Sequence, residues 1–550
     1  MTGRRGLVAA AAVAAALVLV ASSCGRSASP TTPSPGATSA TAGLVTTSPA
    51  GTAPVDSIVW AVYRDVNSLD PIYAFDYPEN TADSLMCESL LRQAPDGSIG
   101  PGIATLSTPN PTTLVFTIKP GVTFWDGHTV TADDVVYSLD RNTNPALAGF
   151  YPAVFNRVKS IEATSSNQVT ITLKQPDYWL PGELASIPGM VLEKSFVEQQ
   201  GKNYGTPAGK IMCTGAYMFQ SFKPGVGVTA VANPHYWNPD VKPLVKSILI
   251  KGISDINTVT SGMLTNAVQG AYEFGIPTLD QLKSSPNVKV YTGPGWSTDA
   301  FIIDNLKGPL GDVRVRQALS LALDRQGIID SVYKGAALMP RWQSNPGTFG
   351  YAPSVFNAAY NSSPVMTQNF TKAKQLMQES GAAGKTITIG MSSQLANIAA
   401  VAGAYQAAGQ AIGLNVKLKS VSAQNYINFF IDPKARAGVD GFMTVNYGDY
   451  ADPAALLSTF VLPPGSQNFD HYNNPTITKD LDEARGTADP NKRAALVSDA
   501  EKIAATDLPW IPNVQPTNLL ILNKNVTGAV ASFAYMFAPW ADDLGGTGSS

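Results

Sequence analysis

The clearest indication of the fold comes from "KTITIGMSSQLANIAAVAGAYQAAGQAIGLNVKLKSVSAQNYINFFIDPKARAGVDGFMTVNY", residues 385–447. It contains three strand-like runs, at 385–391, 415–421 and 440–447, separated by helix-like runs at 395–414 and 423–431. This alternation favours parallel strands joined by right-handed crossovers. The stretch therefore predicts an α/β domain with a mainly parallel sheet.

The whole chain is large and carries little net charge. At roughly 100 to 200 residues per domain, 550 residues indicate two to four domains. An apolar content of 44% with 14% charged residues is enough for large packed cores. A net charge of -3 and a pI of about 5.7, without a run of Lys and Arg, argue against a nucleic-acid-binding protein.

The N-terminus has the pattern of an export signal. Arg4 and Arg5 precede an apolar run that ends in small residues and Cys24. Small residues followed by cysteine resemble a bacterial lipobox, so we predict a signal peptide at 1–23 and lipidation of Cys24. A plain secreted protein and an uncleaved membrane anchor remain the alternatives. The Ser-, Thr- and Pro-rich remainder of 24–54 predicts a flexible tether, so the folded part should begin near Val55.

The other two cysteines, Cys87 and Cys213, should lie in an oxidising compartment. A pair there is more often a disulfide than a metal site. Two separate buried thiols are the alternative that the sequence leaves open.

The segment "FWDGHTVTADDVVYSLDR", residues 124–141, gathers Asp126 and His128 with three further aspartates. Thr131 stands where a helix N-cap belongs, and Asp133 and Asp134 follow in the first turn, where acidic residues favour the helix dipole. The chain has only 3 histidines, and no second His or Cys stands at metal-binding spacing from His128. We therefore predict capping and solvated charge here, and no metal or catalytic site.

Motifs spread along most of the chain carry a family resemblance. They are "NSLDP" (67–71), "ESLLR" (88–92), "FTIKPGVTFWDGHTVTADDVVYSLDR" (116–141), "TGAYMF" (214–219), "ANPHYW" (232–237), "DVRVRQALSLALDR" (312–325), "GDYADP" (448–453), "NFDHYNNP" (468–475) and "DPNKRAALVSDAEKIAATDLPWIP" (489–512). In this order they resemble the extracytoplasmic solute-binding proteins, family 5, of dipeptide and oligopeptide ABC importers.

The resemblance implies a periplasmic-binding-protein-like α/β fold of type II, with mixed sheets flanked by helices and an extra domain. Three lobes are expected to close on a ligand. Lobe I would comprise 55–92, 206–295 and 510–550. Lobe II, the additional one, would comprise 93–205, and lobe III would comprise 296–509.

The loop after 440–447 is the first candidate for a ligand site, because ligands of open α/β sheets bind beyond the carboxyl ends of strands. In the family an aspartate at this position receives the ligand's α-ammonium, and the resemblance gives Asp449 that role, with Tyr447 and Asn446 as neighbouring wall residues. Hydrogen bonding within the loop is the alternative for Asp449. Asp452 precedes Pro453 and is expected to cap the following helix.

A second wall is expected from "FDYPENTADSLM", residues 75–86. In peptide-binding relatives this piece is extended and pairs with the ligand main chain like an added strand. The candidates are Tyr77, Glu79, Asn80 and Thr81, and a surface turn is the alternative.

Together these features predict a monomeric, lipid-anchored receptor that captures a short peptide or an amine-bearing solute. It would present the solute to a permease and an ATPase on separate chains, with no cofactor, metal or nucleic acid. The same fold also binds oligosaccharides, haem and metal chelates in other members of the family. A secreted hydrolase and a surface adhesin are more remote alternatives, and the sequence has no G-x-S-x-G, H-E-x-x-H or P-loop motif.

Overall fold

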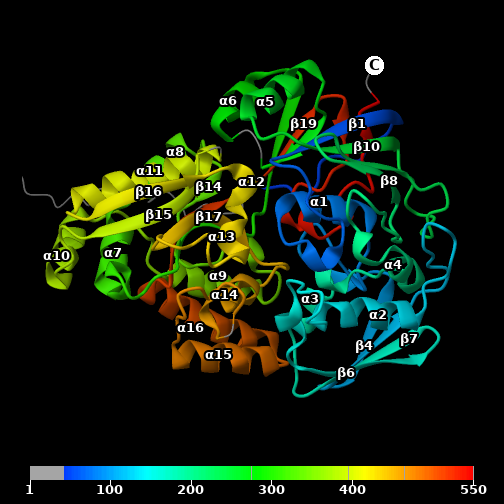
Figure 1. Ribbon diagram of the computed structural model, residues 1–550, viewed down its shortest axis with the longest axis horizontal. Coiled ribbons are helices and arrows are strands. Elements are labelled where there is room, and N and C mark those ends of the chain that lie inside the picture. Colours follow the sequence, from blue (N-terminus) through cyan, green and yellow to red (C-terminus); the bar gives the residue numbers. More distant parts are fainter. Residues whose placement is uncertain (1–42, 274–275, 394, 464, 549–550) are drawn as a thin grey trace, which may run out of the picture. The chain divides into compact units, whose positions relative to one another are not determined.

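The computed structural model describes residues 43–273, 276–393, 395–463 and 465–548 (Figure 1). The predicted signal peptide, Cys24 and the first part of the tether lie outside these residues. Among the helices that the structure describes, none combines the length and the apolar character needed to cross a membrane.

A seven-stranded sheet gathers segments from both ends of the chain. Its order is β12-β19-β11-β1-β10-β9-β8, and β1 is parallel to β10 and β11 while the other pairs are antiparallel. The strands are β1 (Val55–Val62), β8 (Tyr217–Lys223), β9 (Gly227–Ala232), β10 (Val245–Gly252), β11 (Gly270–Tyr272), β12 (Val288–Gly293) and β19 (Asn518–Asn523).

A four-stranded antiparallel sheet, β4-β5-β7-β6, forms a second unit. Its strands are β4 (Ala104–Asn110), β5 (Thr113–Ile118), β6 (Val158–Ser165) and β7 (Gln168–Leu173). Helix α2 (Ala132–Thr143) lies over this sheet (Figure 1), and together they enclose an apolar cluster of their own. The α2 helix begins with a capping box in which the Thr131 and Asp134 side chains bond reciprocally to backbone N–H groups, so the predicted capping is confirmed.

A six-stranded sheet, β14-β18-β13-β17-β15-β16, contains the three strands predicted within residues 385–447. Its strands are β13 (Ser297–Ile303), β14 (Ala337–Leu338), β15 (Thr386–Ser392), β16 (Asn415–Val421), β17 (Gly441–Tyr447) and β18 (Trp510–Pro516). The predicted alternation is confirmed, because α11 (Ala396–Ala411) joins β15 to β16 and the short α12 (Ala423–Tyr426) and α13 (Asn428–Ile431) lead to β17.

The prediction of a mainly parallel sheet is wrong for this unit. The parallel pairs are β15 with β16 and β15 with β17, whereas β13, β14 and β18 are added in antiparallel pairs. These antiparallel strands come from distant parts of the chain, so the local alternation contains no information about them.

The remaining elements cover the sheets or connect them. The helices are α1 (Tyr77–Met86), α3 (Leu180–Glu183), α4 (Lys194–Gln200), α5 (Ile256–Thr265), α6 (Leu279–Ser284), α7 (Val313–Ala322), α8 (Arg325–Ser331), α9 (Pro353–Ser362), α10 (Phe370–Ser380), α14 (Pro453–Val461), α15 (Pro475–Gly486) and α16 (Pro490–Asp507). The short strands β2 (Leu91–Gln93) and β3 (Ile99–Pro101) pair with each other, as do β20 (Val526–Thr527) and β21 (Gly545–Gly546).

The chain passes between the seven-stranded and the six-stranded sheet at two neighbouring crossings. Residues 294–296 join β12 to β13, and Thr517 joins β18 to β19. The Asn345 side chain donates to the Ser297 carbonyl at 3.1 Å and to the Pro516 carbonyl at 2.9 Å, which holds the two crossings together. Gly295 packs so closely that a Cβ there would lie 2.1 Å from the Pro516 carbonyl oxygen.

These crossings correct one predicted boundary. The predicted lobe I includes 510–550, but β18 pairs with β13 in the six-stranded sheet, and only the chain after Thr517 returns to the seven-stranded one. The division into three lobes otherwise stays a prediction.

The folded part also begins earlier than Val55. The Val45 N–H donates to the Thr292 carbonyl at 2.9 Å, and the Ser48 hydroxyl accepts from the N–H groups of Gly528 and Ala529, both at 2.9 Å. The prediction of a flexible tether is therefore wrong for residues 45–53. Composition could not show it, because the partners are backbone groups far away in the sequence, at Thr292 and at 528–529.

Cys87 and Cys213 form a disulfide, as the sequence predicts. Their Cα atoms are 4.9 Å apart, 126 residues separate them, and both are buried. The bond ties the end of α1 to the segment that enters β8.

Replacing both cysteines by alanine should destabilise the protein by about 2 to 5 kcal/mol, because the bridge restricts a long loop in the unfolded chain. Urea unfolding followed by tryptophan fluorescence measures the change, with the reduced wild-type protein as the matched control. An unchanged unfolding midpoint in the double variant would contradict this role of the bridge.

Candidate ligand-binding site

A cavity of about 710 Å³ lies among the three sheet units. It is lined by residues from β1 and α1, from α3 and the segment before it, and from β17 with the loop that follows it. A cavity of this size is typical of small-molecule sites.

The loop after β17 lines the cavity as predicted, with Asn446, Tyr447 and Asp449 all in the wall. The Tyr447 hydroxyl donates to the Phe75 carbonyl at 2.9 Å, which joins this loop to the chain before α1. Asn446 accepts from the Tyr447 N–H at 2.9 Å and donates to the Gln467 side chain. Two of the three predicted residues are therefore held in place by bonds within the protein.

Asp449 is different, because its carboxylate forms no salt bridge or hydrogen bond with the residues that the structure describes. Its backbone carbonyl accepts a hydrogen bond from the Gln93 side chain at 2.7 Å, so the backbone and not the carboxylate holds the loop in place. Burial raises the pKa of Asp449 to about 7. A carboxyl in this state gains most from a cationic partner supplied from outside.

Asp452 has a structural role. It is the N-cap of α14, and its side chain accepts from the Ala454 N–H at 2.9 Å, as the sequence predicts. Burial raises its pKa to about 6.

Glu183, at the end of α3, is a further residue of the cavity wall that the sequence motifs do not predict. It lines the cavity, and burial together with the nearby Asp449 charge raises its pKa well above the ordinary value. Arg485 lowers this pKa only in part, since it is already paired with Asp177 at 2.6 Å. Nothing in the local sequence marks Glu183, because the two carboxyls meet only through the tertiary structure.

The prediction that residues 75–86 form an extended wall is wrong. Residues Tyr77–Met86 form helix α1, with Asp76 as the N-cap accepting from the Tyr77 N–H at 2.8 Å. The N–H and C=O groups of a helix are bonded internally, so this segment cannot add a strand to a ligand.

Of the four residues predicted in that segment, Tyr77 and Thr81 line the cavity. Glu79 and Asn80 lie outside the lining and are buried. Glu79 forms a bidentate pair with Arg64, with both bonds at 2.8 Å, and accepts from the Asn67 N–H at 2.7 Å. Its role is to hold Arg64 behind the wall, so neither Glu79 nor Asn80 belongs to the candidate site.

Aromatic rings make up much of the wall. The rings of Tyr77 and Tyr447 meet edge to face at 5.1 Å, and those of Tyr272 and Tyr535 stack at 3.5 Å. All four tyrosines line the cavity. Such walls bind apolar groups and cations alike.

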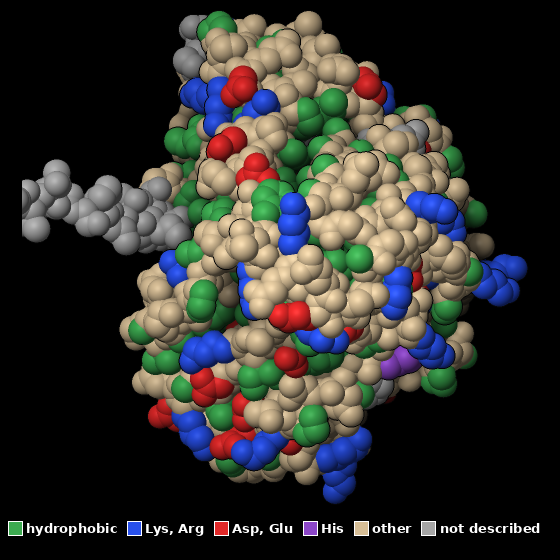
Figure 2. Space-filling model, turned by 90° about the vertical axis from the view of Figure 1, so that its left-hand side faces the viewer, with side chains coloured by type: hydrophobic (Ala, Val, Ile, Leu, Met, Phe, Trp, Pro, Cys, Tyr) green, Lys and Arg blue, Asp and Glu red, His purple; other side chains and the backbone are tan. Residues whose placement is uncertain are grey.

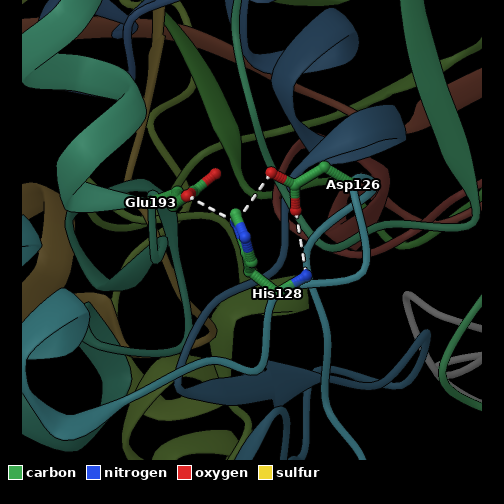
Figure 3. Close-up of side chains that lie close together, drawn as sticks. All are labelled: Asp126, His128 and Glu193. Carbon is green, nitrogen blue, oxygen red and sulfur yellow. Dashed lines mark hydrogen bonds and ion pairs between the residues drawn. The ribbon is translucent and has the colours of Figure 1, made fainter.

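Outside the cavity, His128 lies between two carboxylates (Figure 3). Its Nδ1 is 2.9 Å from Asp126 Oδ2 and 3.0 Å from Glu193 Oε1. These three side chains could hold a metal ion. They are equally satisfied by an imidazolium, because the bond to Glu193 and the charge of Asp126 raise the pKa of His128.

The surface gives no sign of a nucleic-acid partner on the face that Figure 2 shows. There, Lys and Arg side chains are interspersed with Asp and Glu and form no continuous basic area.

Comparison with known proteins agrees with the fold. Residues 98–468 match the family described as bacterial extracellular solute-binding proteins, family 5 Middle. The chain is 28% identical over 497 residues to the periplasmic murein peptide-binding protein MppA of Escherichia coli (strain K12), covering 86% of this chain and 90% of the relative. It is 27% identical over 499 residues to the periplasmic oligopeptide-binding protein OppA of the same organism, covering 84% and 88%.

Among solved structures, the periplasmic binding protein DppA from Helicobacter pylori in complex with the peptide STSA superimposes with a TM-score of 0.78 at 21% identity. The superposition covers 90% of this chain and 99% of that one, which confirms the expected periplasmic-binding-protein fold. Because the family match extends over more than half of the sequence, this chain belongs to family 5 of the bacterial extracellular solute-binding proteins.

Proposed function

We propose that this chain is the lipid-anchored substrate-binding component of an ABC importer, and that it captures a short peptide or another amine-bearing solute. The observation that carries the proposal is the Asp449 carboxylate, which faces the cavity without a cationic partner in the described part of the chain. An ammonium group would supply that partner, and a neutral ligand would leave a buried charge unpaired.

The relatives support a peptide as the solute. MppA and OppA are named for binding murein peptide and oligopeptides, and the DppA complex holds a peptide. A cavity of about 710 Å³ has room for a ligand of a few residues.

Contacts between distant segments support capture by closure. Arg157 pairs with Asp482, and Arg485 pairs with Asp177, so α15 is tied to the segments that flank the four-stranded sheet. A ligand held between these parts would favour the closed arrangement, which a permease and its ATPase on separate chains would then recognise. In this scheme the receptor acts as a monomer.

Replacing Asp449 by asparagine should weaken binding of a free-amine tripeptide by about 1 to 3 kcal/mol, because a charged hydrogen bond is lost. Isothermal titration calorimetry measures the change. The N-acetylated peptide, which lacks the ammonium, should lose no affinity in the variant. Asp126→Asn, a carboxylate outside the cavity, is the matched control, and an Asp449→Asn affinity equal to the wild type would remove Asp449 from the site.

Affinity for a free-amine peptide should rise with pH up to the pKa of Asp449, which is about 7. The ammonium binds the ionised carboxylate, whereas burial keeps the unliganded carboxyl protonated below that pH, so binding releases a proton. The gain is up to about tenfold per pH unit for each proton released, and Glu183, whose pKa is also raised, adds to the slope. Calorimetry in two buffers of different ionisation enthalpy counts the protons, and equal affinities at about pH 5 and pH 7 would contradict the assignment.

Replacing Cys24 by alanine should move the chain from the membrane fraction to the soluble fraction of a bacterial host, because the lipid anchor cannot be attached. Fractionation followed by immunoblotting measures this. Cys87→Ala, which leaves Cys24 intact, is the control for an unspecific effect of cysteine loss. Retention of the Cys24→Ala chain in the membrane would exclude lipidation as the anchor.

A further inference from the structure

Glu273 lines the cavity and has an unusual backbone conformation. It follows β11 directly and has a φ of +53°, the left-handed region that a non-glycine residue seldom adopts. Its N–H donates to the Leu519 carbonyl at 2.8 Å, so the pairing of β11 with β19 continues through it and holds the conformation. Backbone strain of this kind persists where the surrounding structure enforces it, often at ligand sites.

The Glu273 side chain faces the same cavity as Asp449 but has no cation of its own. Its Oε1 is buried and accepts no hydrogen bond from the part of the chain that the structure describes. Burial raises the pKa of Glu273 to about 8, and the nearby Tyr77 lowers it only in part. A buried carboxylate is unfavourable until a positive charge meets it.

Tyrosines surround this carboxyl. The electrostatic effect of Glu273 contributes, after burial, to the raised pKa values of Tyr77, Tyr333 and Tyr535. All three line the cavity. A carboxylate among aromatic rings is the chemistry that binds an ammonium or a guanidinium group.

Glu273 and Asp449 come from different walls of the cavity. Glu273 follows β11 of the seven-stranded sheet, and Asp449 lies in the loop after β17 of the six-stranded sheet. The two acidic residues therefore reach one cavity from two separate sheets.

The arginines of the wall are already paired. Arg157 is bonded to Asp482, and Arg485 to Asp177. A carboxylate on the solute would therefore find no unpaired arginine among the described residues that line the cavity, whereas a second cation would find Glu273.

We propose that Glu273 is a second cation-binding group of this cavity, so that the solute carries two positive charges, one at Asp449 and an ammonium or guanidinium at Glu273. The inference rests on the proposed function. It narrows the solute class from amine-bearing compounds in general to peptides with a basic residue, or to diamines.

The test compares tripeptides with a free N-terminus in which lysine at the first, second or third position is exchanged for its uncharged isostere norleucine. At one position, the wild-type protein should bind the lysine peptide at least about tenfold more tightly than the norleucine peptide in calorimetry. Glu273→Gln, which keeps the shape of the side chain, should reduce this ratio to about one. No preference for lysine at any position, or a preference that survives in Glu273→Gln, would overturn the proposal.

Two further variants separate this proposal from the one it rests on. Asp449→Asn should weaken both peptides and leave the lysine-to-norleucine ratio intact. Glu162→Gln, an exposed carboxylate on β6, is the matched control and should keep both the ratio and the affinities. Melting curves of the free proteins check that each variant is folded, and Glu273→Gly, which relieves the positive φ, should melt no lower than the wild type while losing the preference.

If no tripeptide bound the wild-type protein, peptide capture would be excluded. Binding of diamines would then still show whether Glu273 binds a cation. The melting temperature should then rise more with 1,5-diaminopentane than with 1-aminopentane, and Glu273→Gln should remove the difference. Equal shifts with the two amines would overturn the second cation site.

Discussion

The candidate site depends on the two places where the chain passes between its large sheets. Residues 294–296 and Thr517 are neighbouring crossings, and the Asn345 side chain bonds to the carbonyls of Ser297 and Pro516 that flank them. Gly295 allows this approach because its position has no room for a Cβ. The crossings allow two cores to form separately while the cavity between them keeps walls from both. In the proposed closure these crossings would serve as the hinge, since few residues would need to change conformation.

Some charged residues near the cavity are paired with one another and support its wall, whereas others have no charged partner among the described residues and are available to a ligand. Arg64 is bonded to Glu79 and Asp76, and other internal ion pairs tie α15 to the four-stranded unit. By contrast, Asp449, Glu183 and Glu273 face the cavity, and the described residues offer them no salt bridge. Burial without a partner explains the raised pKa of each. These unpaired carboxyls support the proposal that the solute is positively charged.

The helix at Tyr77–Met86 shows where a family resemblance was less informative than local chemistry. Asp76 at the N-cap, Pro78 in the first turn and Glu79 beside the helix dipole are all signals of a helix start. The resemblance instead suggested an extended wall. Tyr77 and Thr81 still reach the cavity, because residues four apart share one face of a helix, while Glu79 and Asn80 point elsewhere.

The sequence alone determined the features that depend on neighbouring residues or on long, dense motifs. These were the alternation of strands and helices at 385–447, the capping of α2 and α14, the family, and the loop that carries Asp449. Tertiary structure alone decided what depends on residues far apart in the chain. It added β13 and β18 in antiparallel pairs, bonded residues 45–53 to segments far away in the sequence, and brought Glu183 and Glu273 to the cavity. Their chemistry comes from loss of solvent and from unpaired charge, and neither property exists before the chain has folded.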